Sequence, residues 1–159
     1  MNSSQKYALF ALRITLGWMF FYAGITKVLD SSWSAAGYLA GAKSFPALFA
    51  WFASPSVIPV TNFLNAWGLT LLGVALLLGI AVRLSSMLGV LLMTLYYLTA
   101  LDFPFPNAHS LLVDQHVIYS AALFVLATFH AGRVWGLEEW CSRLSFLKKY
   151  PKLREICIS

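Results

Sequence analysis

The sequence predicts an all-α membrane protein in which four transmembrane helices form a bundle. The first observation is composition: 60% of the 159 residues are hydrophobic and 11% are charged, whereas a soluble domain carries about 25% charged residues. The second is that the apolar residues gather into four stretches approaching the roughly 20 residues that a helix needs to cross a bilayer. The third is length, which suits one domain. We therefore expect a single membrane domain over residues 1–159.

The four spans are expected at about residues 7–28, 61–82, 85–102 and 114–131. The first is longer than the apolar segment of a signal peptide and is not closed by a cleavage site, so we expect it to be retained. The second and third are joined only by residues 83–85, which predicts a tight antiparallel hairpin. Pro104 and Pro106 indicate a turn between the third and fourth spans.

Two segments outside the spans also carry a helical pattern. The first connection, about residues 29–61, is rich in aromatic side chains, which favour the membrane–water interface. Ser31 or Ser32 is a candidate cap for one short helix there, and Pro46 for the start of another, so we expect short interfacial helices in this first outer loop. Residues 134–155 combine apolar residues near helical spacing with many basic ones, which predicts an amphipathic C-terminal helix on the lipid surface.

The positions of lysine and arginine predict the orientation, because these residues mark cytoplasmic loops. With four spans, one side of the membrane carries eight of them: Lys6, Arg83, Arg133, Arg143, Lys148, Lys149, Lys152 and Arg154. The opposite side carries only Lys27 and Lys43. We therefore expect a multi-pass protein of the cytoplasmic membrane with both termini in the cytoplasm. The basic tail favours lipid headgroups as its partner over nucleic acid.

Arg13 and Lys27 are the basic residues of the first span, and an ionisable residue inside a membrane is a functional candidate. Arg13 has two interpretations: it reaches the cytoplasmic surface, or it faces the bundle and binds an anion, a carbonyl group or a helix terminus. Lys27 follows fourteen residues later, which places it within about 40° of Arg13 around the helix. Gly17 and Gly24 also share a face. They allow close helix packing or leave room for a flat ligand.

The predicted topology brings further polar residues to the outer end of the bundle, namely Asp30, Asn62, Asn65, Asp102, His109, Asp114 and His116 beside Lys27. One interpretation is ordinary loop polarity, with Asp114 capping the fourth helix. The other is a proton-handling site in which Asp114 and His116 are the catalytic pair, since a carboxylate raises the basicity of a neighbouring histidine. A quinone needs such a donor beside an aromatic slot.

Several aromatic residues of the spans are candidates for that slot or for ordinary packing: Phe20, Phe21, Tyr22, Tyr96 and Tyr97. A metal site is not expected, because Asp114 and His116 supply only two ligands and no cluster completes a set. Cys141 and Cys157 fit no common metal or redox spacing. Phosphate loops and dinucleotide-binding glycine motifs are also missing from the sequence.

Four runs of residues together resemble the DoxX family, over about residues 7–140. In the first run, Leu12 to Lys27, Arg13 is followed by Gly17, by aromatic residues and by Gly24-x-x-Lys27. The other runs are Trp67 to Gly79 with Arg83 after it, Val113 to Tyr119, and Gly132 to Leu137.

This resemblance implies a four-helix membrane protein related to the DoxD-type subunit of thiosulfate:quinone oxidoreductase, with quinone as the electron acceptor. One departure affects the proton chemistry. Several relatives carry glutamate after the first glycine of the second helix, where this chain has Leu69. If that glutamate handles protons in the relatives, this protein uses another group or lacks the activity.

We therefore expect a quinone-linked oxidoreductase component that passes electrons from a small donor, such as a sulfur compound, to membrane quinone. The expected binding residues are Arg13, Lys27, Phe20, Asn65 and Tyr97, with Asp114 and His116 relaying protons. One alternative is a non-enzymatic membrane subunit or scaffold for a redox partner. Another is a small transporter or lipid-binding bundle. The oligomeric state is not indicated by the sequence.

Overall fold

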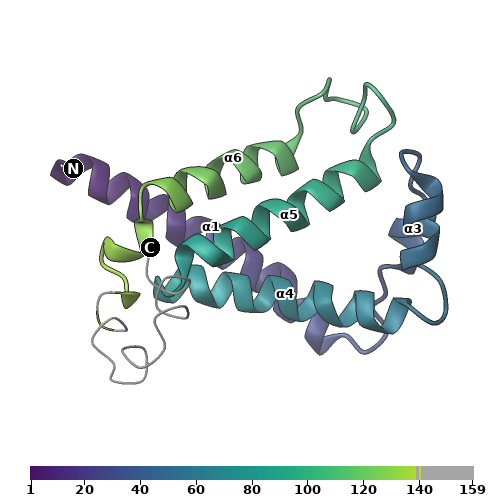
Figure 1. Ribbon diagram of the computed structural model, residues 1–159, viewed down its shortest axis with the longest axis horizontal. Helices are drawn as coiled ribbons and strands as arrows, with labels where there is room; N and C mark the ends of the chain where they lie inside the picture. The colour runs from purple at the N-terminus through teal and green to yellow at the C-terminus, as the bar shows by residue number, and fades with distance from the viewer. Residues whose placement is uncertain (139, 141–159) are drawn as a thin grey trace.

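Four long helices lie roughly lengthwise beside one another in the computed structural model, which describes residues 1–138 and 140 (Figure 1). They are α1 (Ser3–Leu29), α4 (Ile58–Leu78), α5 (Val82–Ala100) and α6 (Gln115–Thr128). The first three are long and apolar enough to cross a membrane, and α6 is a shorter apolar helix. The prediction of an all-α membrane bundle is confirmed. The predicted amphipathic helix over 134–155 falls mostly outside the described residues.

Side-chain caps fix the starts of α1 and α6. Asn2 accepts a hydrogen bond from the Gln5 N–H, and the Gln5 side chain accepts one from the Asn2 N–H, each at 2.9 Å. This reciprocal pair satisfies two of the backbone donors that a helix leaves open at its first turn. At α6, the Asp114 carboxylate accepts from the N–H groups of His116 and Val117. The interpretation of Asp114 as the cap of this helix is therefore confirmed. The cap also places Asp114, a candidate site residue, at the start of α6.

The hairpin between α4 and α5 forms as predicted, but it turns about four residues earlier, at Gly79, Ile80 and Ala81. Gly79 has a φ of 67°, in the left-handed region that glycine enters without steric cost. Its N–H and that of Ile80 bond to carbonyls of the last helical turn, a common way to end a helix. The predicted linker at residues 83–85 is wrong because the glycine, rather than the charge on Arg83, sets the end of α4.

Glycines bring α1 and α4 into backbone contact. A Cβ atom on Gly24 would collide with the backbone of Thr70, and one on Gly73 would collide with the backbone of Phe21. Gly17 lies against Leu77 in the same seam. The expectation that Gly17 and Gly24 allow close packing is confirmed, and no flat ligand fits between these two helices at those positions.

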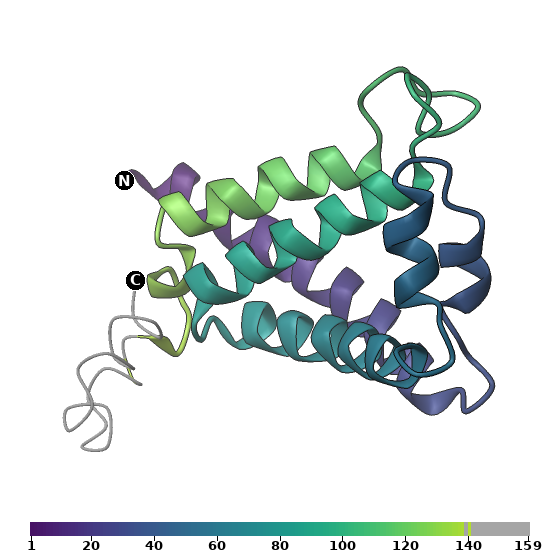
Figure 2. The same cartoon turned by 45° about the vertical axis from the view of Figure 1, so that its right-hand side comes forward.

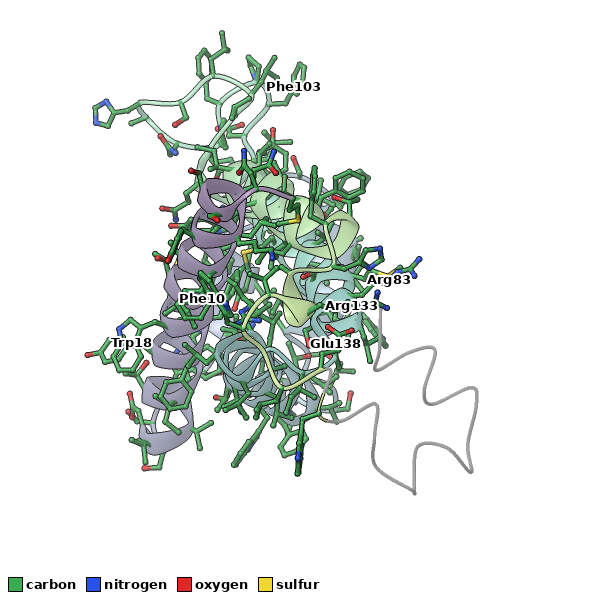
Figure 3. All side chains as sticks on the ribbon, turned by 90° about the vertical axis from the view of Figure 1, so that its left-hand side faces the viewer. Phe10, Trp18, Arg83, Phe103, Arg133 and Glu138 are labelled. Atoms are coloured by element: carbon green, nitrogen blue, oxygen red, sulfur yellow. The ribbon has the colours of Figure 1, made fainter. Side chains whose placement is uncertain are left out.

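A continuous apolar core joins the pair α1 and α4 to the pair α5 and α6. Phe20, Leu72, Leu76, Leu123 and Leu126 are buried together. Apolar side chains also cover the outside of the bundle: Trp18 is 59% exposed and points away from α1 in Figure 3. Such a surface suits contact with lipid, because a soluble protein seldom exposes large apolar patches.

Two short helices, α2 (Ala36–Ala40) and α3 (Pro46–Phe52), cover the outer end of the bundle (Figures 1 and 2). Phe49 of α3 is buried in a second apolar cluster, which also contacts Ile58 of α4 and Leu98 of α5. Pro46 starts α3 as predicted, but α2 begins after Ala35, and neither Ser31 nor Ser32 caps it.

The chain ends divide the bundle into an inner and an outer end. The N-terminus and the segment after α6, including the short 3-10 helix Ala131–Arg133, lie at one end, which we call the inner end (Figure 2). The α2–α3 loop and the loop between α5 and α6 lie at the other, outer end. This arrangement agrees with an even number of crossings, and the cytoplasmic placement of the inner end stays a prediction.

Candidate functional site

A polar pocket opens at the outer end, where the four long helices meet the first outer loop. We call it the outer pocket. Its volume is about 360 Å³, within the range of roughly 300–1,000 Å³ found for small-molecule sites. The residues that line it are Lys27, Trp33, Ser34, Ala35, Tyr38, Asn65, Tyr96, Gln115 and His116. Five separate segments therefore contribute side chains to one site.

Lys27 lies at the centre of the polar contacts. Its Nζ donates to Asn65 Oδ1 at 3.0 Å and to Tyr96 Oη at 3.1 Å, and Tyr96 Oη donates to Asn65 Oδ1 at 2.8 Å. These three side chains form a closed triangle from α1, α4 and α5. An ammonium group has three donors, so this triangle uses two of them and leaves the third for a ligand.

Aromatic rings surround the ammonium group. Lys27 Nζ lies 4.9 Å from the ring centre of Trp33 and 5.4 Å from that of Tyr96, within the distance at which a ring face attracts a cation. The Tyr38 and His116 rings both meet the Tyr96 ring edge to face, at 6.0 and 5.8 Å. The pocket therefore has flat walls beside a positive charge.

Asp114 and His116 form a tight pair at the start of α6. His116 Nδ1 lies 2.6 Å from Asp114 Oδ2, and the side chains are 15% and 3% exposed. A carboxylate at one ring nitrogen fixes the tautomer of the imidazole, so the contact at Nδ1 leaves Nε2 as the other ring nitrogen. His116 also lines the outer pocket, together with Lys27 and Tyr96.

Tyr38 ties the first outer loop to α5. Its hydroxyl donates to the Tyr96 carbonyl at 3.0 Å. Burial, and secondarily the negative charge of Asp114, raise the pKa of Tyr38, so this phenol stays neutral and holds its hydrogen bond. The first outer loop therefore forms one wall of the pocket, through Trp33, Ser34, Ala35 and Tyr38.

The structure brings together four of the seven predicted site residues: Lys27, Asn65, Asp114 and His116. Tyr97 is not among them. Its hydroxyl donates to the Leu112 carbonyl at 2.6 Å and holds the loop between α5 and α6. Phe20 is also absent from the pocket. It is buried in the core and meets the Tyr119 ring edge to face at 6.3 Å.

Arg13 lies at the opposite end of α1, about 21 Å from Lys27 along the helix. Its side chain is fully buried and donates to the carbonyls of Ala131 at 2.9 Å and Trp135 at 3.3 Å. Of the two interpretations of Arg13, the structure supports the one in which it faces the bundle and binds carbonyl groups. It does not contribute to the outer pocket.

Other polar residues of the predicted outer cluster make local contacts instead. Asp30 accepts hydrogen bonds from the backbone and hydroxyl of Ser32, and these bonds lower the pKa of Asp30. Asp102 pairs with Lys43 at the surface. Asn62 accepts from the Ala35 N–H, which fixes the first outer loop. His109 lies exposed in the loop after α5.

Three aromatic residues of the pocket, Trp33, Tyr38 and Tyr96, were not among the seven predicted site residues, although Tyr96 was a candidate for the aromatic slot. Tyr96 and Tyr97 are adjacent on one helix and therefore point about 100° apart, so choosing between them requires the rotation of α5. Trp33 and Tyr38 lie in a loop whose path the spacing of residues does not determine. Within the described part of the chain, no three potential metal ligands gather.

The family model of DoxX matches residues 8–102, more than half of the chain. The match includes Lys27, Asn65 and Tyr96, whereas the Asp114–His116 pair lies after it. No curated protein and no solved structure matches the chain significantly. The resemblance inferred from the sequence is confirmed over the matched residues: this multi-pass membrane protein belongs to the DoxX family.

Proposed function

We propose that the outer pocket binds the head group of a membrane quinone and that the protein is a quinone-linked oxidoreductase component. The observation that carries the proposal is the Lys27–Asn65–Tyr96 triangle beside the Asp114–His116 pair. A quinone ring is flat, apolar on its faces and carries two carbonyl oxygens. The pocket offers the complementary set: aromatic walls, a cation and several hydrogen-bond donors.

Each donor suits a carbonyl acceptor. The remaining N–H of Lys27 supplies a charged hydrogen bond, which is stronger than a neutral one. Asn65 contacts Lys27 and Tyr96 through Oδ1, so among the described residues its amide N–H groups remain as donors for a carbonyl. His116 Nε2 supplies a proton when the ring is cationic and withdraws one when it is neutral.

The proton balance gives His116 a defined task. Oxidation of two thiosulfate ions to tetrathionate releases two electrons and no proton, whereas reduction of a quinone to a quinol takes up two electrons and two protons. With such a donor, both protons have to come from water through the protein. His116, held by Asp114 and lining an open pocket, is positioned to deliver them one after the other.

The test is quinone binding and turnover by the purified protein in lipid nanodiscs. Trp33 lies beside Lys27, so a bound quinone quenches part of the tryptophan fluorescence, and a Trp33→Phe variant loses that part of the signal. Turnover is followed as quinone absorbance with thiosulfate and other small sulfur donors. Lys43→Met is the matched control for Lys27→Met, since Lys43 is an exposed lysine of the same end.

Quinone binding that depends on Lys27 but not on Lys43, together with donor-dependent reduction, supports the proposal. Absence of both quinone binding and turnover contradicts it and favours the non-enzymatic subunit. Binding without turnover in the isolated chain points to a missing redox subunit, which co-purification from native membranes identifies.

A further inference from the structure

An apolar groove runs between α4 and α5 on the outside of the bundle. Figure 1 shows the two helices close together at their hairpin and spreading toward the outer end, where α3 lies. The groove encloses about 490 Å³. The residues that line it are nearly all aliphatic: Leu64, Gly68, Leu71, Leu72, Ala75, Leu84, Ser85, Leu88, Leu91, Leu92 and Leu95. We call it the α4–α5 groove.

The groove faces the surroundings of the bundle. Leu71, Leu88 and Leu91 are 60%, 54% and 58% exposed, and all three lie in helices long enough to span the membrane. Gly68 lines the groove as well, and a Cβ atom built on it would meet nothing within 4 Å. The groove is therefore open space at membrane depth, and its walls suit a hydrocarbon chain.

A second, smaller apolar cavity lies between this groove and the outer pocket, since it shares lining residues with both. Leu64, Leu92 and Leu95 line both the α4–α5 groove and this cavity. On its other side, Asn65 and Tyr96 line both the cavity and the outer pocket. Apolar and polar spaces therefore share one wall, formed by the hydrogen-bonded Asn65–Tyr96 pair.

The volumes of the small cavity and the outer pocket indicate which part of one ligand each can hold. The small cavity holds about 150 Å³, less than the roughly 300 Å³ at which small-molecule sites begin. It is too small for a substituted ring but wide enough for part of a chain. The outer pocket reaches that size and carries the donors, so it suits the ring.

We propose that the α4–α5 groove holds the hydrocarbon tail of the quinone, and that the quinone enters the outer pocket from the membrane by passing the Asn65–Tyr96 pair. This inference rests on the proposed function, because the head group identifies the ligand. Passage requires the hydrogen bond between these two side chains to open. During passage, a quinone carbonyl takes the place of Asn65 Oδ1 as the acceptor for Lys27 and Tyr96, and the Asn65–Tyr96 hydrogen bond forms again once the ring is in the pocket.

The experiment uses two quinones that share one ring, one without a tail and one with a decyl chain ending in a diazirine. Both are tested on the full-length protein in nanodiscs. Photolysis is expected to attach the tail to peptides of α4 and α5 that contain Leu71, Leu88 or Leu91. Gly68→Leu fills the groove and should weaken binding of the tailed quinone by about tenfold, the scale of an overpacked site, while the tailless quinone binds as before.

Gly37→Leu is the matched control, since Gly37 in α2 also has open space around it and does not line the groove. It should leave both affinities unchanged. Should Gly68→Leu fold poorly, Leu88→Trp repeats the test on α5. Met87→Trp is its control, because Leu88 lines the groove and Met87 does not.

Three results would overturn the inference. If the tailless quinone binds and the tailed one labels peptides outside α4 and α5, the tail lies elsewhere and the proposed function stands. If a diazirine-bearing phospholipid labels the groove and quinone does not displace it, the groove belongs to a lipid acyl chain. If neither quinone binds, the proposed function fails, and the tail site fails with it.

Discussion

Arg13 and Lys27 are two cations on one face of α1, yet they have opposite surroundings. Arg13 is fully buried at the inner end, and its guanidinium binds backbone carbonyls of the segment after α6. Among the described residues, the hydrogen bonds of Lys27 go only to side chains, and Lys27 lines an open pocket. Carbonyls held in a folded segment do not move aside for a ligand, whereas side chains do. One cation therefore holds the fold together, and the other is available to a ligand.

The inner end is closed around Arg13 on every side that the structure describes. A Cβ atom on Gly79 or Gly136 would collide with the guanidinium, and the Phe10 ring lies 5.4 Å from it. The buried carboxylate of Glu138 adds an opposite charge nearby. Figure 3, viewed from this end, labels Arg133 and Glu138 of the segment after α6, and Arg83 of α5.

The largest effect is expected for Arg13→Gln, measured as unfolding of the protein in detergent. Removing one partner of a buried charge pair costs about 3–5 kcal/mol, so the free energy of unfolding should fall by that amount. The double variant with Glu138→Gln should recover part of the loss. A stability change for Arg13→Gln no larger than for Lys27→Gln would contradict the contrast between the two ends.

The next effect concerns His116→Gln, which keeps a polar side chain but cannot carry the proton. Turnover should fall by about 100-fold, the lower range for loss of a general acid–base group, while quinone affinity changes little. Asp114→Asn should slow turnover and shift its pH profile, since the carboxylate no longer fixes the ring. His109→Gln, in the exposed loop, is the control. Equal losses of turnover in the His116→Gln and His109→Gln variants would contradict a specific role of His116 in proton transfer.

Lys27→Met is expected to weaken quinone binding by about tenfold or more, because a hydrogen bond to a charged group contributes roughly 1.5–3 kcal/mol. The unfolding midpoint should move little, since an apolar side chain of similar length replaces a cation. Titration of fluorescence quenching measures the affinity. An unchanged quinone affinity would show that Lys27 does not contact the ligand.

The smallest effect distinguishes two neighbouring tyrosines. Tyr96→Phe removes a hydroxyl from the Lys27–Asn65 triangle and should reduce quinone affinity about fivefold, the equivalent of one neutral hydrogen bond. Tyr97→Phe removes a hydroxyl that holds the outer loop and should leave affinity unchanged. Its expected signature is faster amide exchange around Leu112. The reverse pattern would place the ligand on the other side of α5.

Much of the fold follows from hydrophobicity and spacing. The four apolar stretches, the tight hairpin, the prolines of the outer loop and the Pro46 helix start all have local signals in the sequence. The predicted linker at residues 83–85 is wrong because Gly79, four residues earlier, carries the helix-ending signal. α2 lacks a side-chain cap, so nothing local marks where it begins.

The site was predicted only in part, for a physical reason. Lys27, Asn65, Asp114 and His116 meet because they lie at the outer ends of their helices, and topology alone brings such residues together. The roles of Arg13, Phe20 and Tyr97 depend instead on helix rotation and on what the inner segment contributes. Those are long-range contacts, and the spacing of residues along one helix contains no information about them.

The backbone contacts at Gly24 and Gly73 have a mechanical consequence. Two helices that touch main chain to main chain cannot slide or roll without a steric clash, so α1 and α4 form one stiff half of the molecule. The seam between α4 and α5 holds an open groove, and a Cβ atom on Gly68 there would meet nothing within 4 Å. We therefore expect breathing motions to occur there, with the Gly79 turn as the pivot. A cross-link between α1 and α4 should leave these motions intact, and one across α4 and α5 should suppress them.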